Sequence, residues 1–303
     1  MTRVGWIGLG AMGRPMVGVA AAAGFEVRAF DVNASQLVGL ERPGLVTASS
    51  GEDAMREADV AVVMVATPAQ GEEVIFGDRG IAATLRAGTT VVVMATVGPQ
   101  AVLRWSELLG ERGIDLVDAP VSGGVARAAT GELLTMVGGP DSAVAKAREL
   151  LEAVSGSLIV IGPQPGDGQR MKLVNQLLAG VHIAVAAEAL GFAEAVGLDA
   201  SAAWEVVRQG AAFSFMLEDR GPRMLQGSFD DVRSAINIFA KDMTLVSAAA
   251  HEAMYPTPIA SAAEQMYFVA RRAGLGHLDD SSVIEVARGS FANRARGDGS
   301  ERT

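Results

Sequence analysis

The sequence that decides the fold is the stretch Gly166–Leu198, which reads GDGQRMKLVNQLLAGVHIAVAAEALGFAEAVGL. Its lack of proline predicts one helix of roughly thirty residues, about 45 Å long. No formal charge occurs between Leu173 and Ala187, so we expect protein to cover most of the helix surface there. The uncharged run is too short for a membrane span, and it contains Asn175, Gln176 and His182.

The first turns of this stretch carry Lys172, with Asn175 and Gln176 three and four residues later on the same helical face. Of the 25 basic residues only Lys146, Lys172 and Lys241 are lysine. Arginine stays protonated, whereas a desolvated lysine can release its proton, so a lysine kept in an arginine-rich chain points to proton transfer. The alternative is a helix-end lysine whose ammonium reaches solvent.

Length and charge limit the possible functions. A chain of 303 residues favours two domains, and a net charge of −10 argues against a nucleic-acid or membrane partner. The absence of cysteine excludes disulfides and thiolate metal sites, and the three histidines are too scattered for a metal site. Because a strand is expected to begin at Arg3, no room remains for a signal peptide, and we expect a soluble cytoplasmic protein.

A glycine-rich turn follows that strand, Arg3–Gly8, and consists of Gly8-Leu9-Gly10-Ala11-Met12-Gly13. An alanine-rich helix and a second strand, Glu26–Asp31, come next. This is the arrangement of a dinucleotide-binding site, in which glycines let the pyrophosphate approach the helix N-terminus and the acid takes the ribose hydroxyls. Asp31 favours NAD, because its carboxylate would repel the 2′-phosphate of NADP. A glycine-rich turn without a ligand is the alternative.

Apolar runs predict further strands over Asp59–Val65, Thr89–Ala95, Ile114–Ala119, Leu133–Gly138 and Leu158–Gly162. The first two are expected to be parallel and buried on both faces. Together these segments predict an α/β fold, a doubly wound Rossmann sheet.

Two loops at the carboxyl ends of these strands are candidate ligand contacts. Thr96 is expected to contact the nicotinamide or its ribose, or to cap the helix that begins near Pro99. Ser122, Gly123 and Gly124 present consecutive backbone N–H groups, a nest suited to a carboxylate, unless they form an ordinary turn.

The second half of the chain shows helical spacing throughout. We expect an NAD-binding domain over residues 1–163, the long helix and an all-α domain over 164–292, and a disordered tail over 293–303. Helical segments are expected at Asp199–Gln209, Phe213–Leu225, Ala235–Ala250, Pro258–Ala273 and Ser281–Arg288, with a break at Gly221-Pro222.

With these pieces placed, the chain resembles the β-hydroxyacid dehydrogenase family, which includes 3-hydroxyisobutyrate and tartronate-semialdehyde reductases. The resemblance extends to about Arg288, and its carriers are residues 7–16, 118–124, the pattern Gly166-x-Gly168-x-x-x-Lys172-x-x-Asn175-Gln176, and Lys241-Asp242. It implies an N-terminal Rossmann domain, a long interdomain helix and an α-helical C-terminal domain that pairs with a second subunit, as a homodimer or homotetramer.

The resemblance also implies residue roles. Lys172 is the catalytic residue, Ser122–Gly124 hold the substrate carboxylate, Asn175 positions substrate, and Thr96 and Lys241 contact the cofactor.

Two positions depart from the common family pattern. Gln176, which we also place at the substrate, stands where many relatives carry asparagine. Met94-Ala95 replaces the acidic start of the loop before Thr96.

Segments 213–220, 234–242 and 274–280 are similar to the L-threonate dehydrogenase branch. We expect reversible hydride transfer between NAD and a small hydroxy acid, with Lys172 accepting or donating the proton. The alternatives are a 3-hydroxyisobutyrate or tartronate-semialdehyde reductase activity, a non-catalytic NAD-binding scaffold, and an imine reductase, whose known members replace the lysine.

Overall fold

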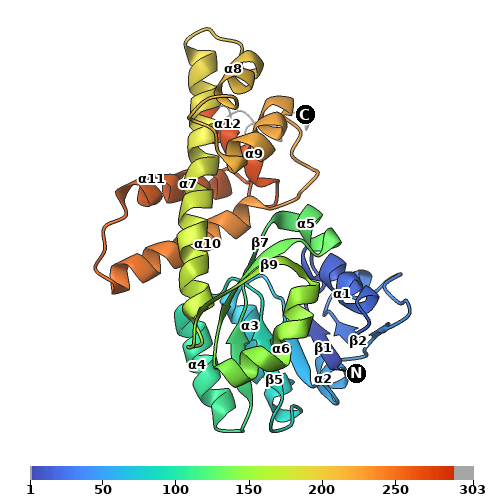
Figure 1. The fold of residues 1–303 in the computed structure, drawn as a ribbon. Helices are drawn as coiled ribbons and strands as arrows, with labels where there is room; N and C mark the ends of the chain where they lie inside the picture. The colour runs from blue at the N-terminus through green and yellow to red at the C-terminus, as the bar shows by residue number, and fades with distance from the viewer. Residues whose placement is uncertain (1, 290–303) are drawn as a thin grey trace, which may run out of the picture. The chain divides into compact units, whose positions relative to one another are not determined.

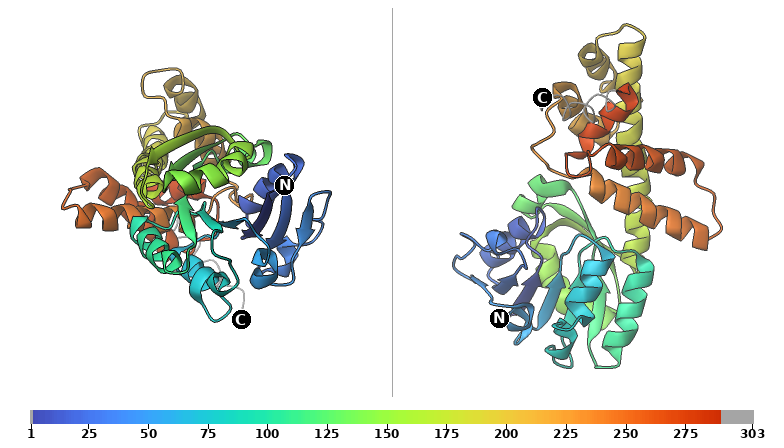
Figure 2. Two further views of the ribbon diagram at one scale, coloured as in Figure 1. Left: turned by 60° about the horizontal axis from the view of Figure 1, so that its bottom comes forward. Right: turned by 180° about the vertical axis from the view of Figure 1, so that it is seen from behind.

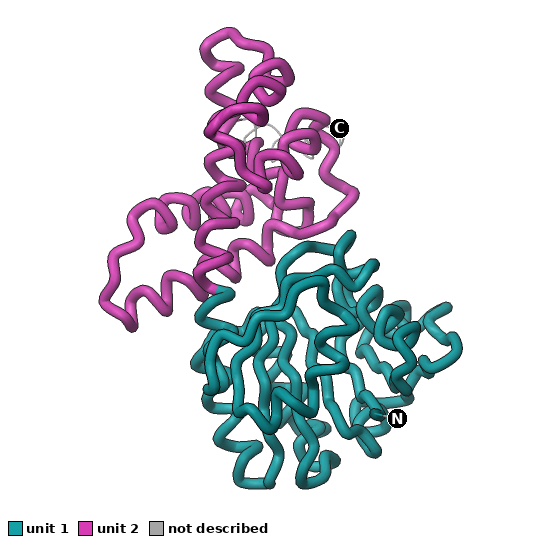
Figure 3. Tube along the Cα trace, in the orientation of Figure 1, with its two compact units in different colours: residues 1–172 teal, residues 173–303 magenta. Residues whose placement is uncertain are grey.

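The computed structural model describes residues 2–289, and the chain forms two compact units, residues 1–172 and 173–303 (Figure 3). The first unit extends beyond the boundary expected at residue 163, because the first turns of the long helix bond to the sheet of this unit. The tail expected over 293–303 and the end of the expected 164–292 domain lie outside the described residues.

The first unit is built on one sheet. Its strands follow the order β3-β2-β1-β4-β5-β6-β8-β7, with β9 on the other side of β8. The six strands from β3 to β6 are parallel, whereas β8 runs antiparallel to β6. The bounds are β1 Arg3–Ile7, β2 Glu26–Phe30, β3 Leu45–Thr47, β4 Val60–Val63, β5 Thr90–Val93, β6 Asp115–Asp118, β7 Val121–Ser122, β8 Leu133–Gly138 and β9 Ser155–Gly162.

Helices cover both faces of this sheet (Figures 1 and 2). Alternate residues of β4 pack in opposite directions, Val60 and Val62 with α1 and α6, and Ala61 and Val63 with α2, α3 and α4. The expected doubly wound sheet is therefore confirmed. The helices are α1 Gly13–Ala22, α2 Gly51–Met55, α3 Pro68–Phe76, α4 Pro99–Gly110, α5 Gly124–Thr130 and α6 Asp141–Ala153, with short 3-10 turns at Ala34–Gln36 and Ile81–Ala83.

The long helix is confirmed as α7, Asp167–Ala195 (Figure 1). By length and composition α7 alone among the described helices could cross a membrane, but half of its apolar window is buried inside the protein. That burial fits the core helix of a soluble protein.

The second unit is all-α, as expected. Its core gathers apolar side chains of α7 with those of the later helices. Gly180 permits a close approach, because a Cβ there would lie 2.4 Å from the sulfur of Met243. The helices are α8 Ala200–Val207, α9 Phe215–Gln226, α10 Ile236–Glu252, α11 Pro258–Arg272, the 3-10 turn η3 Asp280–Val283, and α12 Ile284–Arg288.

The break expected at Gly221-Pro222 is wrong, because α9 continues through Pro222. Buried ion pairs hold the helix on both sides of the proline. Arg220 donates to Asp280, and Arg223 donates to Asp279 at 3.1 Å. Tertiary contacts thus override the local cost of a proline inside a helix.

Candidate active site

The glycine-rich turn lies at the carboxyl end of β1, directly before α1. Gly8 has a φ of +98°, and a Cβ at this position would lie 2.1 Å from the carbonyl oxygen of Met64. A Cβ on Gly13 would lie 2.0 Å from the carbonyl oxygen of Gly8. Only glycine fits at these two positions, whereas Gly10 and Ala11 are exposed at the tip of the turn. Met12 is half-buried and precedes the helix.

Asp31 follows β2 and is bonded to this turn. One carboxylate oxygen accepts a hydrogen bond from the Leu9 N–H at 2.7 Å, and the other accepts one from the Asn33 N–H at 2.8 Å. The side chain keeps partial exposure, so its oxygens can also accept ribose hydroxyls. An acid beside a helix N-terminus with exposed backbone fits a dinucleotide, the pyrophosphate lying on the turn and the ribose at Asp31.

Lys172 lies in the second turn of α7 and is 6% exposed. Its ammonium donates a hydrogen bond to the carbonyl oxygen of Val121 at 2.8 Å. Val121 directly precedes the Ser122–Gly124 loop, in which Gly123 and Gly124 have φ values of +137° and +72°. Within the first unit, the structure therefore brings the proposed acid–base residue next to the proposed carboxylate loop.

Asp118 was absent from the expected site residues, although it opens the motif that contains Ser122. It ends β6 and is completely buried. Its two carboxylate oxygens accept the N–H groups of Gly166 at 2.7 Å and Gln169 at 2.6 Å. Burial raises the pKa of Asp118 to about 7, and the two N–H donors oppose that rise.

Gln169 was also missed. Its side-chain oxygen accepts the N–H groups of Val97 and Gly98, each at 3.0 Å, and its side-chain nitrogen donates to the carbonyl oxygen of Ala95 at 2.9 Å. These three bonds hold the backbone on both sides of Thr96, which is half-buried. The nearest sequence signal was the second glycine pair, Gly166-x-Gly168, which indicates a close backbone approach at the start of α7 but identifies neither residue.

The remaining expected residues lie in the second unit and form a polar chain. The side-chain nitrogen of Asn175 donates to the side-chain oxygen of Gln176 at 2.8 Å, and Gln176 in turn donates to Asp242 at 2.5 Å. Lys241 lies 2.8 Å from the other oxygen of Asp242, an ion pair without the angles of a hydrogen bond. Gln176 and Asp242 are buried, whereas Asn175 and Lys241 keep partial exposure.

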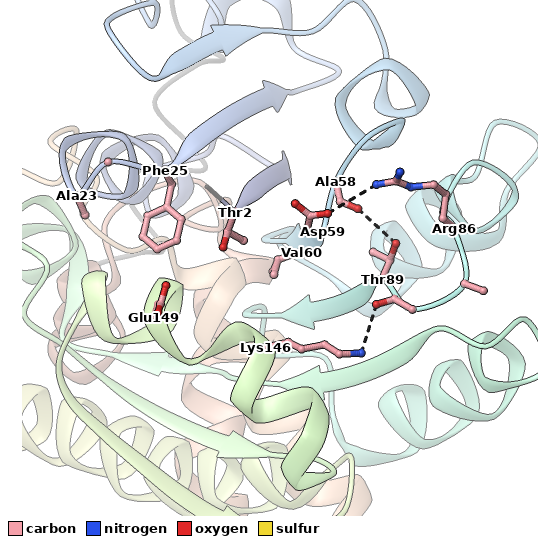
Figure 4. Close-up of a pocket in the computed structure, with 13 residues that line it drawn as sticks. Thr2, Ala23, Phe25, Ala58, Asp59, Val60, Arg86, Thr89, Lys146 and Glu149 are labelled. Atoms are coloured by element: carbon pink, nitrogen blue, oxygen red, sulfur yellow. Dashed lines mark hydrogen bonds and ion pairs between the residues drawn. The ribbon is translucent and has the colours of Figure 1, made fainter.

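A pocket of about 690 Å³ in the first unit lies elsewhere (Figure 4). It is at the amino ends of β1, β4 and β5, the sheet edge opposite the glycine-rich turn. Two of its basic side chains form ion pairs, Arg86 with Asp59 at 3.7 Å and Lys146 with Asp115 at 3.5 Å. We therefore place the functional site at the carboxyl edge, where ligands bind in open parallel sheets.

A first unit of this kind is that of a nicotinamide-dependent dehydrogenase. Residues 3–162 match the NAD binding domain of 6-phosphogluconate dehydrogenase, and residues 166–287 match the NAD-binding region of NADP-dependent 3-hydroxyisobutyrate dehydrogenase.

Individual proteins are similar in sequence to this chain over nearly its whole length. L-threonate dehydrogenase of Cupriavidus necator is 40% identical over 94% of this chain and 96% of its own length. NAD-dependent L-serine dehydrogenase of Pseudomonas aeruginosa is 34% identical over 94% and 98%. The crystal structure of 3-hydroxyisobutyrate dehydrogenase from Salmonella typhimurium is 34% identical, covers 94% of this chain and 100% of that one, and has a TM-score of 0.89.

The chain belongs to the β-hydroxyacid dehydrogenase family. It is an NAD-dependent hydroxyacid dehydrogenase.

Proposed function

We propose that the protein oxidises a small sugar acid of the L-threonate type, reversibly and with NAD rather than NADP, in the cytoplasm. The relative at 40% identity is an L-threonate dehydrogenase, and segments 213–220, 234–242 and 274–280 favour the same branch. Asp31 supports NAD, because its carboxylate is bonded to the Leu9 N–H of the glycine-rich turn and would repel the 2′-phosphate of NADP.

The observation that carries the proposal is the Lys172–Val121 contact, which places a buried amine beside a loop of glycine backbone. The Ser122–Gly124 N–H groups bind the substrate carboxylate. Lys172 takes the proton of the substrate hydroxyl as the C–H bond of the hydroxyl-bearing carbon breaks. The bound nicotinamide supplies the acceptor for the hydride. In the reverse direction Lys172 returns the proton to the carbonyl oxygen.

The family resemblance implies roles for three residues of the second unit. Asn175, one helical turn after Lys172 in α7, holds the substrate, and Gln176 fixes the Asn175 amide through their hydrogen bond. Lys241 contacts the cofactor. Asp242 orients both Gln176 and Lys241, since it touches each of them.

Reduction of NAD by the purified protein tests the substrate. The acids to compare are L-threonate, D-threonate, D-glycerate, 3-hydroxyisobutyrate and tartrate, together with reduction of tartronate semialdehyde. The highest kcat/KM with L-threonate is the expected result. A preference for 3-hydroxyisobutyrate or tartronate semialdehyde would place the protein in another branch of the family. NAD binding without turnover of any acid would indicate a scaffold.

We also propose that the second unit pairs with a second copy of the chain. Four large apolar side chains of α7 remain about half exposed or more: Val174 at 53%, Leu178 at 51%, Val185 at 52% and Phe192 at 66%. Their spacing of four, seven and seven residues places them in one stripe. Because a twofold interface brings the same surface together from both copies, one such stripe can cover another.

A further inference from the structure

We propose that Asp118 and Gln169 are positioning residues of the dehydrogenase reaction, which fix the first turns of α7 so that Lys172 and the Thr96 loop stay in register. The proposal rests on the proposed proton transfer by Lys172. Neither residue touches substrate or cofactor in this scheme. Both act through the backbone that they hold.

Asp118 caps the N-terminus of α7. A helix begins with backbone N–H groups that lack partners inside the helix. Here the two carboxylate oxygens of a residue in β6 supply acceptors for two such groups. Asp118 binds the N–H of Gly166, just before the helix, and that of Gln169 in its first turn. The same carboxylate also lies at the positive end of the helix dipole. It therefore fixes the position of α7 along its axis and its rotation.

Close approach to this carboxylate explains Gly168 in the second glycine pair. A Cβ on Gly168 would lie 2.4 Å from the carbonyl oxygen of Met136 and 2.9 Å from an Asp118 oxygen. A Cβ on Gly138, in β8, would lie 2.7 Å from the other Asp118 oxygen. Side chains at these positions would push the helix away from β6 and β8.

Gln169 holds the loop after β5. Gln169 uses both ends of its amide on Ala95, Val97 and Gly98, so the amide cannot rotate without loss of hydrogen bonds. Gln169 is completely buried, and each lost bond would leave a polar group without water. The position of the Thr96 backbone therefore follows that of α7.

Asp118 and Gln169 lie close in sequence to the two residues of the Lys172–Val121 hydrogen bond. Lys172 follows Gln169 by three residues, and Val121 follows Asp118 by three residues. The Asp118–Gln169 and Val121–Lys172 hydrogen bonds thus join the start of α7 to the end of β6 and the segment after it, at two points three residues apart. A shift of α7 by a single residue is about 1.5 Å, and a displacement of about 1 Å can lower a rate about a hundredfold.

The test compares Asp118→Asn and Gln169→Met with Asp167→Asn. Asp167 is in the first turn of the same helix, but its carboxylate accepts hydrogen bonds from the Gln164 N–H and the Arg170 guanidinium rather than from the Thr96 loop. The control therefore weakens the helix N-terminus without touching the strand or the Thr96 loop. We expect kcat to fall about 10- to 100-fold in the first two variants, with the KM for NAD within about threefold of wild type, and to change less than twofold in the control.

A conservative variant separates positioning from folding. Gln169→Glu retains acceptors for Val97 and Gly98 but loses the donor to Ala95, so its kcat should lie between those of wild type and Gln169→Met. If Asp118→Asn fails to fold, the two Gln169 variants decide the question. Unchanged kcat in both Gln169 variants, or an equal fall in the Asp167 control, would overturn the proposal.

Hydrogen exchange distinguishes this failure from failure of the proposed function. If wild type oxidises no hydroxy acid, the catalytic assignment fails, and the amides still report the anchors. In Gln169→Met, the Val97 and Gly98 N–H groups should exchange at least tenfold faster than in wild type and in the Asp167 control. Unchanged exchange at both amides would reject the positioning role.

Discussion

The ammonium of Lys172 donates a hydrogen bond to the carbonyl oxygen of Val121 at 2.8 Å. A carbonyl oxygen can accept from an ammonium or from a neutral amine, so the contact persists when the proton leaves. The acceptor therefore holds the nitrogen in place in both protonation states. Ser122, the next residue in the chain, begins the loop proposed to bind the substrate carboxylate.

Replacement of Lys172 by arginine should keep the positive charge and remove most turnover. Arginine does not release its proton near neutral pH, so we expect kcat to fall by at least about a hundredfold, within the range attributed to general acid–base catalysis. Steady-state NAD reduction measures this effect. Lys146→Arg is the matched control, because Lys146 lies on the surface of α6 and pairs with Asp115. Wild-type turnover in Lys172→Arg would contradict the mechanism.

Replacement of Asp31 by asparagine should shift cofactor preference. The carboxylate accepts from Leu9 and should also accept from the ribose, and one charge-assisted hydrogen bond contributes about 1.5–3 kcal/mol. We expect the ratio of kcat/KM for NAD to that for NADP to fall about 10- to 100-fold. Asp53→Asn, which removes a carboxylate that pairs with Arg28, should leave the ratio unchanged. An unchanged ratio in Asp31→Asn would show that another group selects the cofactor.

Much of the fold was predictable because its signals are local. The glycine-rich turn, the buried apolar runs and the acid that ends β2 lie within one βαβ unit, and each has a known physical role. The length of α7 followed from a stretch without proline. Lys172 was singled out because lysine is rare in this chain, and its contact with Val121 places it next to the expected Ser122–Gly124 loop.

The anchors of the site were not predictable in the same way. Asp118 meets Gly166 and Gln169 across about fifty residues, and Gln169 meets the Ala95–Gly98 loop across more than seventy. Periodicity and motif spacing carry no information about such pairs. The structure uses Asp118, the acid that ends β6, as a helix cap. The same limit explains Pro222, where buried ion pairs maintain α9.

Glutamate in the apolar stripe of α7 should dissociate the proposed pair. Phe192→Glu places a charge on a surface that two copies would bury, and an unpaired buried charge costs several kcal/mol. Light scattering after size exclusion should show a smaller mass for this variant than for wild type. Val38→Glu is the control, since Val38 is an apolar residue of the first unit with 72% exposure. A monomeric wild type, or an unchanged mass in Phe192→Glu, would reject this interface.

The buried carboxyl of Asp118 should make stability depend on pH. Its pKa is raised from 3.8 to about 7, chiefly by burial and in small part by Asp167, so the folded protein binds more protons than the unfolded chain between about pH 4 and 7. The stabilisation from the neutral form is complete below about pH 4 and is lost as the pH rises through 7. Across that window the loss is on the order of 4 kcal/mol.

Urea unfolding of wild type and Asp118→Asn from pH 5 to 8 measures this loss, because asparagine does not titrate. The free energy of unfolding of wild type minus that of the variant should decrease up to about pH 7 and then level off. Asp167→Asn, which keeps Asp118, should follow the wild-type trend. A difference that stays constant or increases with pH would mean that the Gly166 and Gln169 N–H donors outweigh burial and keep Asp118 ionised throughout.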